Sequence, residues 1–556
     1  MAPAPITTQE VLTLRKGMTK AAGSRMELLR PLLGRPVRSP KALRVWHDLL
    51  LFLIAYPNVA EEHAAATSEL QRVVGIAQDM AQRNGKLRYA LINSGVEGIA
   101  LQSTYTLRIT AWMLKRWQDR VELFSVEAPL DECVELIRLL LPHSEMETVD
   151  QPVDDVAALL ERVFGPSRGV QLVRLVHLFL ALQVDDRTRE LLWSRMQVFV
   201  KVEGAPGCGM SFARSPVGPV HVQSDEVRHS VELAEVLEQR VGGPLRLGRA
   251  APKGLIDTAR TVLATLHRET DPVTFAGAAE LFDMGGGLRV ALFHLDVEHR
   301  LPFDSYVGFM AFKNGVPLAY GGAWIFPGRS KVGINVFPAL RGGNSAWFFA
   351  QLLRLYRQRF HVDRFEAENY QLGHNNPDGL KSGAYWFYYR LGFRPTTKAL
   401  QRSAEREYPK LRNKAGHSVP LAVMKELVEN GLELIVAGSD APVIDTAALT
   451  VAAQHHVVHR YGGERELAEK KVMARLQAGL PLGDLRRWTP ASRHALALWA
   501  PALDMIPDLE NWTKAAKRDV VRLVRCKGDD TETDHQLQLR DHRAVLTALH
   551  KGTPSE

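Results

Sequence analysis

The feature that most constrains the fold is a block of β-type segments between two long helical stretches. Short runs rich in β-branched and aromatic residues occupy positions 289–295, 306–313, 316–325, 331–337 and 362–369. Asn314-Gly315, between the second and third runs, is typical of a two-residue hairpin, because both central positions of a type I′ turn require positive φ. Residues 345–360 and 379–391 have helical periodicity. The sequence therefore predicts an α+β domain built on a sheet in the middle of the chain.

Helical patterns dominate on both sides of this block. Leucines recur at intervals of three and four residues in many places, and such patterns run from residue 8 to about 196. Between this stretch and the sheet, helices are expected over residues 225–240 and 255–268. We therefore divide the chain into an α-helical N-terminal region (1–197), an α/β connecting region (198–280), the sheet domain (281–398) and an α-helical C-terminal region (399–550).

Composition excludes several classes of protein. With 46% hydrophobic and 24% charged residues among 556, the chain is neither disordered nor fibrous. Its three cysteines, Cys133, Cys208 and Cys526, exclude a disulfide framework and a CxxC metal site and fit a reducing compartment. The N-terminus lacks the apolar run of a signal peptide, and the longest apolar run, 49–56, is far shorter than the ~20 residues that span a bilayer. We predict a cytoplasmic protein without a membrane partner.

The net charge of +8 is compatible with an anionic ligand such as a nucleotide cofactor or tRNA, but it requires neither. Basic residues, Arg15 and Lys16 among them, are frequent in the opening segment. We interpret them as a solvated helix face, with a phosphate-facing patch as the alternative.

The segment VFPALRGGNSAWFFAQLL joins the fourth β-type run to a helix and has the properties of a phosphate-binding turn. The first turn of a helix offers backbone amides without partners and a partial positive charge. Gly342 and Gly343 lack Cβ atoms, so the backbone can approach phosphate oxygens closely. Arg341 can add a charge-assisted hydrogen bond. An ordinary glycine-containing strand-to-helix turn is the alternative.

This segment and SGAYWFYYRLGFRP together resemble the GNAT superfamily of acyl-CoA-dependent N-acetyltransferases. In the family's phosphate-binding pattern, Arg341 matches the first position and Ala346 the last, while Asn344 stands where the family prefers glycine. Lys381 replaces an asparagine that is common in the family. In the closing pattern the matching residues are Ala384, Phe387, Tyr388, Leu391, Gly392 and Phe393. With its helical flanks, the chain is similar to a set of bacterial proteins that carry such a core.

The resemblance implies a fold and a reaction. The fold would be a GNAT-like mixed sheet with surrounding helices, between a mostly α-helical N-terminal region and a helical C-terminal region. The enzyme would transfer an acyl group, expected to be acetyl, from acyl-CoA to an amine by direct attack and without a metal. Amides of the fourth strand, residues 333–337, would polarise the thioester carbonyl. The implied cofactor-binding residues are Asn335, Val336, Phe337, Arg341, Gly342, Gly343, Asn344, Ser345, Ala346 and Lys381.

The main candidates for proton transfer are Tyr388, Glu366 and Glu368, and His374, in a long polar loop, is a further candidate for the base. The resemblance implies that Tyr388 is the general acid that protonates the leaving thiolate; a core aromatic is the alternative. Glu366 and Glu368 share one face of the fifth predicted strand, because strand side chains alternate, and either could be the base for an amine. Solvent-exposed strand polarity is the alternative for both.

Other functions remain open at this point. The amine acceptor would be a small molecule or a peptide, and the chain could form a homo-oligomer. A GNAT-like transferase can instead take its acyl group from aminoacyl-tRNA. A third hypothesis is a binding or scaffold protein whose GNAT-like core has lost catalysis.

Overall fold

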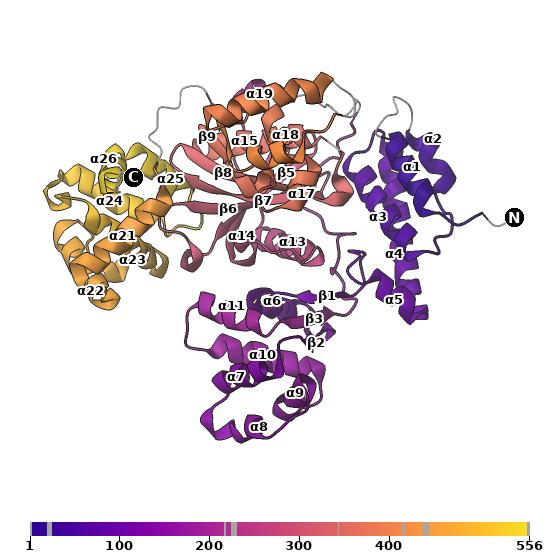
Figure 1. The fold of residues 1–556 in the computed structure, drawn as a ribbon, viewed down its shortest axis with the longest axis horizontal. Coiled ribbons are helices and arrows are strands. Elements are labelled where there is room, and N and C mark those ends of the chain that lie inside the picture. The colour runs from indigo at the N-terminus through magenta and orange to yellow at the C-terminus, as the bar shows by residue number, and fades with distance from the viewer. Residues whose placement is uncertain are drawn as a thin grey trace.

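The computed structural model describes residues 3–18, 25–215, 218–223, 231–342, 344–413, 417–436 and 444–552. Its fold is mixed α+β, as the sequence predicts. Figure 1 shows the sheet at the centre, with the N-terminal helices on one side, the C-terminal helices on the other and a further helical unit below.

The central sheet has eight strands within the described residues: β4 (Ala276–Gly285), β5 (Leu288–Leu295), β6 (Ser305–Lys313), β7 (Val316–Phe326), β8 (Arg329–Val336), β9 (Arg364–Ala367), β10 (Arg394–Pro395) and β11 (Leu432–Ile435). Their order in space is β10-β11-β9-β8-β7-β6-β5-β4. Neighbours pair antiparallel except β8 and β9, which are parallel. The late strand β11 therefore lies between two strands that precede it in the chain.

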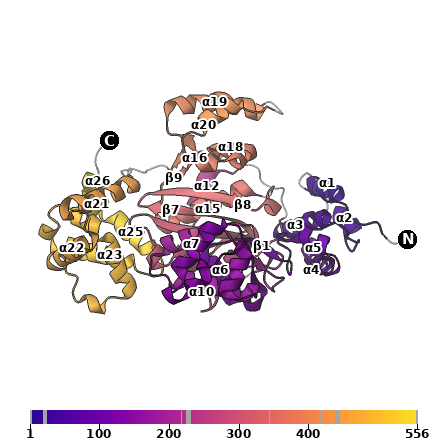
Figure 2. The ribbon, with the colours of Figure 1, turned by 60° about the horizontal axis from the view of Figure 1, so that its bottom comes forward.

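The two faces of the sheet carry different helices, and we name the faces after them. On the α15 face, Phe348 packs against Phe309 of β6 with ring centroids 6.2 Å apart. On the α14 face, Pro272 lies against Gly308, the neighbouring residue of the same strand. Figure 2 shows α18 above the strands. The helices are α13 (Ala251–Thr265), α14 (Asp271–Thr274), α15 (Ser345–Phe360), α16 (Asn369–Leu372), α17 (Pro377–Ser382), α18 (Ala384–Arg390), α19 (Lys398–Asn413) and α20 (Leu421–Leu427).

The five predicted strands correspond to β5 to β9 within two residues at each end, and the helix predicted over 345–360 is α15. The strands β4, β10 and β11 were not predicted, because they are short or rich in alanine and glycine and are ordered by their neighbours in the sheet. The prediction of one helix over 379–391 is wrong. Gly383 adopts φ +71° and separates α17 from α18.

The prediction of helices throughout residues 8–196 is wrong at two segments. β1 (Leu101–Thr104) and β2 (Val121–Val126) each pair antiparallel with β3 (Val198–Val202), in a second sheet of three strands within the described residues. The alternating burial of β3 is the periodicity of a strand. In the helix predicted over 225–240, residues 225–230 lie outside the described residues, and α12 (Leu233–Glu238) covers part of the remainder. The helix predicted over 255–268 corresponds to α13.

Three hydrophobic cores hold the chain together. The first unites the sheet with α1 (Thr8–Met18), α2 (Arg25–Leu29), α3 (Pro40–Ala55), α4 (Ala60–Arg83) and α5 (Gly85–Leu91). The second combines the three-stranded sheet with α6 (Leu107–Trp117), α7 (Leu130–Leu140), α8 (Glu147–Asp150), α9 (Val156–Phe164), α10 (Arg168–Ala181) and α11 (Asp186–Arg195). The third contains α21 (Thr446–Tyr461), α22 (Arg465–Gly479), α23 (Pro490–Met505), α24 (Lys514–Cys526), α25 (Thr533–Asp541) and α26 (Arg543–Gly552).

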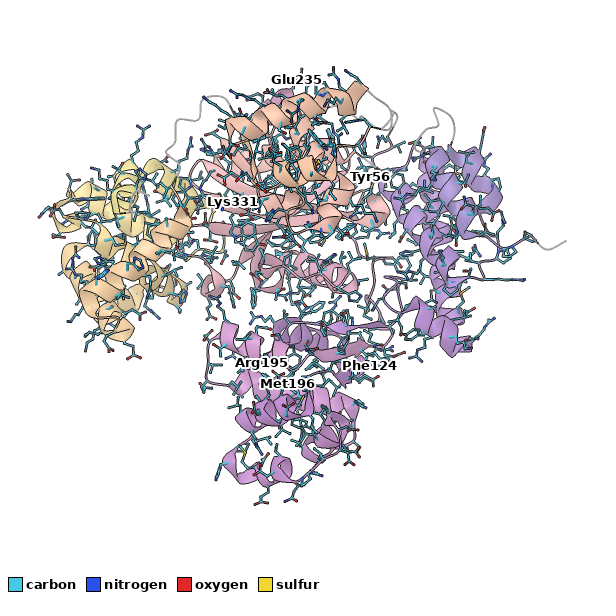
Figure 3. All side chains as sticks on the ribbon, viewed as in Figure 1. Tyr56, Phe124, Arg195, Met196, Glu235 and Lys331 are labelled. Atoms are coloured by element: carbon cyan, nitrogen blue, oxygen red, sulfur yellow. The ribbon has the colours of Figure 1, made fainter. Side chains whose placement is uncertain are left out.

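The N-terminal helices therefore belong to the core of the sheet although about 200 residues separate them along the chain. Figure 3 places Tyr56, which follows α3, at this junction. The ammonium of Lys313, at the end of β6, lies 5.5 Å from the centroid of the Tyr56 ring. This cation–π contact ties the end of an interior strand to the N-terminal helices.

A buried network of charges attaches the C-terminal helices to the sheet. The fully buried carboxylate of Glu532 pairs with Lys527 and accepts a hydrogen bond of 2.9 Å from the Ser305 hydroxyl at the start of β6. Arg300 donates to the backbone carbonyls of Lys527 and Asp530. Charges this deeply buried are tolerated only when they are paired, so the network fixes where the C-terminal helices dock.

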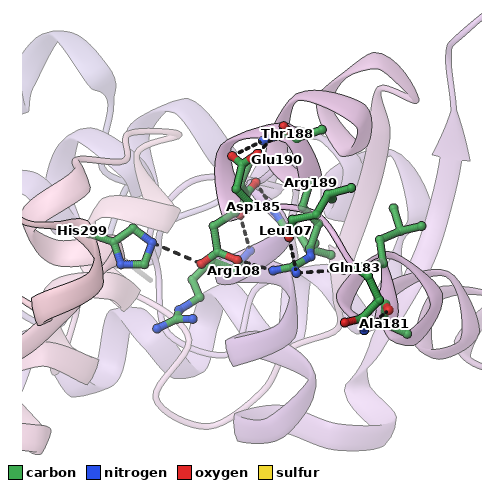
Figure 4. Close-up of polar contacts among 12 residues, drawn as sticks. Leu107, Arg108, Ala181, Gln183, Asp185, Thr188, Arg189, Glu190 and His299 are labelled. Carbon is green, nitrogen blue, oxygen red and sulfur yellow. Dashed lines mark hydrogen bonds and ion pairs between the residues drawn. The ribbon is translucent and has the colours of Figure 1, made fainter. Parts of the chain in front are cut away.

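His299 joins the second core to the sheet. Its ring stacks on Phe275 with centroids 3.9 Å apart, and it pairs with Asp296 and, at 3.2 Å, with Asp186 of α11 (Figure 4). Arg108 of α6 also binds Asp296, at 3.3 Å. Burial lowers the pKa of His299, but the hydrogen bond and charges of the two aspartates outweigh it, and the pKa is raised.

A raised pKa in the folded state means that protonated His299 stabilises the fold at low pH. This contribution is complete below the ordinary pKa of histidine and is lost as the pH rises through the raised value. We expect the unfolding free energy, measured by urea denaturation, to fall as the pH rises above 6.5, and the fall to be smaller in His299→Gln. The exposed His177 of α10 supplies the control His177→Gln, which should keep the wild-type dependence. Identical pH profiles for all three proteins would contradict the assignment.

Candidate functional site

The backbone ladder between β8 and β9 ends early. The two strands pair at Arg329–Arg364, Ser330–Phe365 and Lys331–Glu366. β8 continues to Val336, but beyond Lys331 no partner strand among the described residues lies on its β9 side. Unpaired backbone groups at this edge are therefore free for another ligand.

The amides of Ile334 and Val336 point toward this unpaired edge. The amide of Phe337 donates to the carbonyl of Leu318 on the β7 side, at 3.1 Å. Successive amides of a strand alternate between its two edges, so the even-numbered residues of β8 face β9. Of the three residues predicted to bind the cofactor here, only Val336 presents its amide to the edge. Asn335 and Phe337 point their amides to β7, whereas the amide of Ile334, within the range 333–337 expected to polarise the thioester, points to the edge.

Tyr388 of α18 reaches the unpaired edge from the α15 face. Its side chain is 2% exposed and packs edge-on against Phe349 and Phe393, with centroids 5.4 and 5.3 Å away. Burial raises the pKa of Tyr388, and the neighbouring amide of Ile334 opposes this in part. That amide lies near the hydroxyl but does not complete a hydrogen bond of normal geometry, so the oxygen is buried without a partner among the described residues. Tyr388 thus stays protonated beside the amides of β8.

Glu366 borders the same edge from the α14 face. Cross-strand pairing aligns it with Lys331, Trp324 and Tyr306 in one row across four strands. The rings of Tyr306 and Trp324 stack 4.1 Å apart, and Figure 3 places Lys331 on the sheet. Burial raises the pKa of Glu366, although Arg329 and Lys331 act against it. A half-buried carboxylate with a raised pKa is suited to proton transfer.

Glu368 has a different environment from Glu366. It follows β9 at the first turn of α16, is 50% exposed and pairs with Lys331 at 3.4 Å. Lys331 therefore lies beside both carboxylates predicted as bases: it forms an ion pair with Glu368 and is the cross-strand neighbour of Glu366. Gln371 of α16 also lies here, and its side chain packs against Gly333 so closely that a Cβ atom at Gly333 would come within 2.9 Å of it.

The predicted phosphate-binding turn leads from β8 into α15. Arg341 and Gly342 are exposed, and Gly342 adopts φ +90° with open space where a side chain would be. Nε of Arg341 donates to the carbonyl of Val336 at 3.3 Å. Asn344 is the N-cap of α15, and its Oδ1 is buried without a partner among the described residues. Gly343 lies outside the described residues.

The first turn of α15 has free donors. The amides of Ser345 and Ala346 have no acceptor among the described residues, and the amide of Phe348 donates to the carbonyl of Asn344 at 2.8 Å. These amides and the positive end of the helix dipole give the turn the chemistry of an anion site. Lys381, by contrast, is an exposed side chain on α17.

The cavities of the C-terminal helices are separate from this site. An apolar cavity of about 150 Å³ is bordered by Phe303, Val457 and Val472, and a larger hollow of about 1060 Å³ by Arg518, Arg522 and Arg525. In the described part of the chain, no three His, Cys, Asp or Glu side chains are grouped to hold a metal ion. None of the described helices has the length and apolar character to cross a membrane.

No protein-family model, curated protein or solved structure matches this chain.

The partnerless hydroxyl of Tyr388 gives a prediction about stability. Removing a buried polar atom that lacks a hydrogen bond costs nothing, so Tyr388→Phe should leave the unfolding free energy unchanged or raise it by up to about 1 kcal/mol. The control is Tyr461→Phe, because the Tyr461 hydroxyl donates to the buried carboxylate of Asp504 at 2.8 Å. We expect this variant to lose about 1–3 kcal/mol in chemical denaturation. A comparable loss for Tyr388→Phe would show that its hydroxyl is bound in the folded protein.

Proposed function

We propose that the chain is a GNAT-type N-acyltransferase that moves an acyl group, acetyl in the simplest case, from acyl-CoA to an amine. The observation that carries the proposal is the early end of the β8–β9 ladder beside Tyr388, next to a helix whose first amides, those of Ser345 and Ala346, have no acceptor among the described residues. The strand order, with parallel β8 and β9, supports a GNAT-like sheet.

The turn between β8 and α15 would hold the pyrophosphate of coenzyme A. The amides of Ser345 and Ala346 would donate to its oxygens, and Arg341 would add a charge-assisted hydrogen bond from the exposed side. The open space at Gly342 allows close approach of the backbone. From this turn the unpaired edge of β8 leads directly to Tyr388, so the acyl thioester would lie along that edge.

The transfer would then use both faces of the sheet. Glu366 takes a proton from the acceptor amine on the α14 face, and the amine nitrogen attacks the thioester carbonyl. The amides of Ile334 and Val336 stabilise the negative charge on the carbonyl oxygen. As the carbon–sulfur bond breaks, Tyr388 gives its proton to the thiolate from the α15 face. Acid and base on opposite faces do not neutralise each other.

The cofactor proposal predicts a ligand-dependent stability. Acetyl-CoA at about 100 times its Kd should stabilise the wild-type protein by about 2.7 kcal/mol and raise its Tm. Arg341→Ala should lose most of this shift, whereas Arg390→Ala, at an exposed position of α18, should keep it. A wild-type protein whose Tm does not respond to millimolar acetyl-CoA, and which retains no coenzyme A in native mass spectrometry, is not an acyl-CoA enzyme. Salt-sensitive binding of aminoacyl-tRNA would then favour the alternative donor.

The two carboxylates can be separated by the pH dependence of kcat/KM. Because Glu366 must be ionised to accept a proton and its pKa is raised, activity should fall with decreasing pH at a value above the ordinary range of glutamate. Glu366→Gln should lower kcat about 10²- to 10⁴-fold and abolish this acid limb. Glu368→Gln removes an exposed carboxylate of the same type and should change kcat little. Release of the coenzyme A thiol with a panel of amines measures both, and the reverse ranking would assign the base to Glu368.

A further inference from the structure

The turn between β8 and α15 is held by a side chain that comes more than 300 residues earlier in the chain. Nη2 of Arg15, in α1, lies 2.8 Å from the carbonyl oxygen of Ala339, 3.0 Å from that of Arg341 and 3.5 Å from that of Pro338. One guanidinium thus gathers three carbonyls of a single short turn.

The guanidinium of Arg15 is itself positioned by α3. It lies 5.5 Å from the centroid of the Phe52 ring, and it interacts electrostatically with the carboxylate of Asp48. The helix α3 also packs against the turn at 338–340. Two helices of the N-terminal region therefore determine where this cation sits.

Gathering the carbonyls on Arg15 has an electrostatic consequence for the outer side of the turn. Carbonyl oxygens carry partial negative charge and would repel a pyrophosphate if they faced it. With those of Ala339 and Arg341 bound to Arg15, the exposed side presents the Arg341 side chain and the backbone of Gly342, next to the free amides of α15. The positive charge of Arg15 lies directly behind the turn and adds to the attraction.

We infer that Arg15 is a positioning residue for acyl-CoA and that the N-terminal helices are part of the cofactor site. This inference rests on the proposed function, because it assigns the cofactor's pyrophosphate to the turn that Arg15 holds. The N-terminal helices would then contribute to cofactor binding as well as to the hydrophobic core of the sheet.

Two variants and a control test the inference. Arg15→Ala should raise the KM for acetyl-CoA about tenfold, as expected for the loss of charge-assisted hydrogen bonds, and leave kcat at saturating acetyl-CoA within about twofold. Arg15→Lys keeps the charge but cannot span three carbonyls, so its KM should be intermediate. Arg30→Ala removes an exposed arginine of the same region, paired with Glu61, and should match the wild type.

Hydrogen exchange without any ligand supplies a second readout. In Arg15→Ala the amides of residues 339–342 should exchange faster than in the wild type, while those of β7 stay protected. An unchanged KM in Arg15→Ala, or a fall in kcat and Tm with KM unchanged, would overturn the inference and leave Arg15 a structural contact. If the wild-type protein does not bind acetyl-CoA at all, the proposed function fails, and the cofactor role of Arg15 fails with it. Faster exchange would then still identify Arg15 as the residue that orders the turn.

Discussion

The end of the β8–β9 ladder at Lys331–Glu366 is the constraint on which the rest of the site depends. A sheet normally satisfies every backbone amide of an interior strand. Here the interior strand β8 leaves the amides of Ile334 and Val336 without a neighbouring strand among the described residues, although its other edge is paired with β7 as far as Val336. Everything proposed for the site follows from that exception: a buried hydroxyl on one side of the edge, a half-buried carboxylate on the other and a turn with free amides at its end.

Three distant parts of the sequence come together at this unpaired edge of β8 and the turn that follows it. The sheet supplies the amides, α18 supplies Tyr388, and α1 supplies Arg15 behind the turn. Their positions are fixed by one hydrophobic core that includes the N-terminal helices as well as the sheet. The second core meets the sheet at the polar junction of His299. The third core meets it at Glu532 and also through apolar packing of Phe303 and of Phe326 in β7. The N-terminal helices therefore belong to the same core as the sheet that carries the site, whereas α21 to α26 form a core of their own.

The sequence predicted strands and helices correctly where the periodicity of apolar residues matches the face that the element buries. The strands around Asn314-Gly315 and the helix α15 alternate or repeat so regularly that their limits could be predicted within two residues. It failed where a partner decides the structure. β11 is four residues long and is a strand because β9 and β10 flank it. Which amides of β8 face the open edge follows from its register with β7, in which Phe337 donates to Leu318. Arg15 has the sequence pattern of a basic residue on a surface helix, and only the fold places it next to the turn.

The insertion of β11 between β9 and β10 also has a consequence for how the protein is made. The chain leaves the ribosome from its N-terminus, so β9 and α18 appear well before residues 432–435. Until then β9 is an edge strand and can pair with any extended segment that meets it. This edge of β9 therefore stays unpaired while more than sixty further residues are synthesised, and the interval in which a chaperone could usefully shield it is set by the distance between β9 and β11 along the chain.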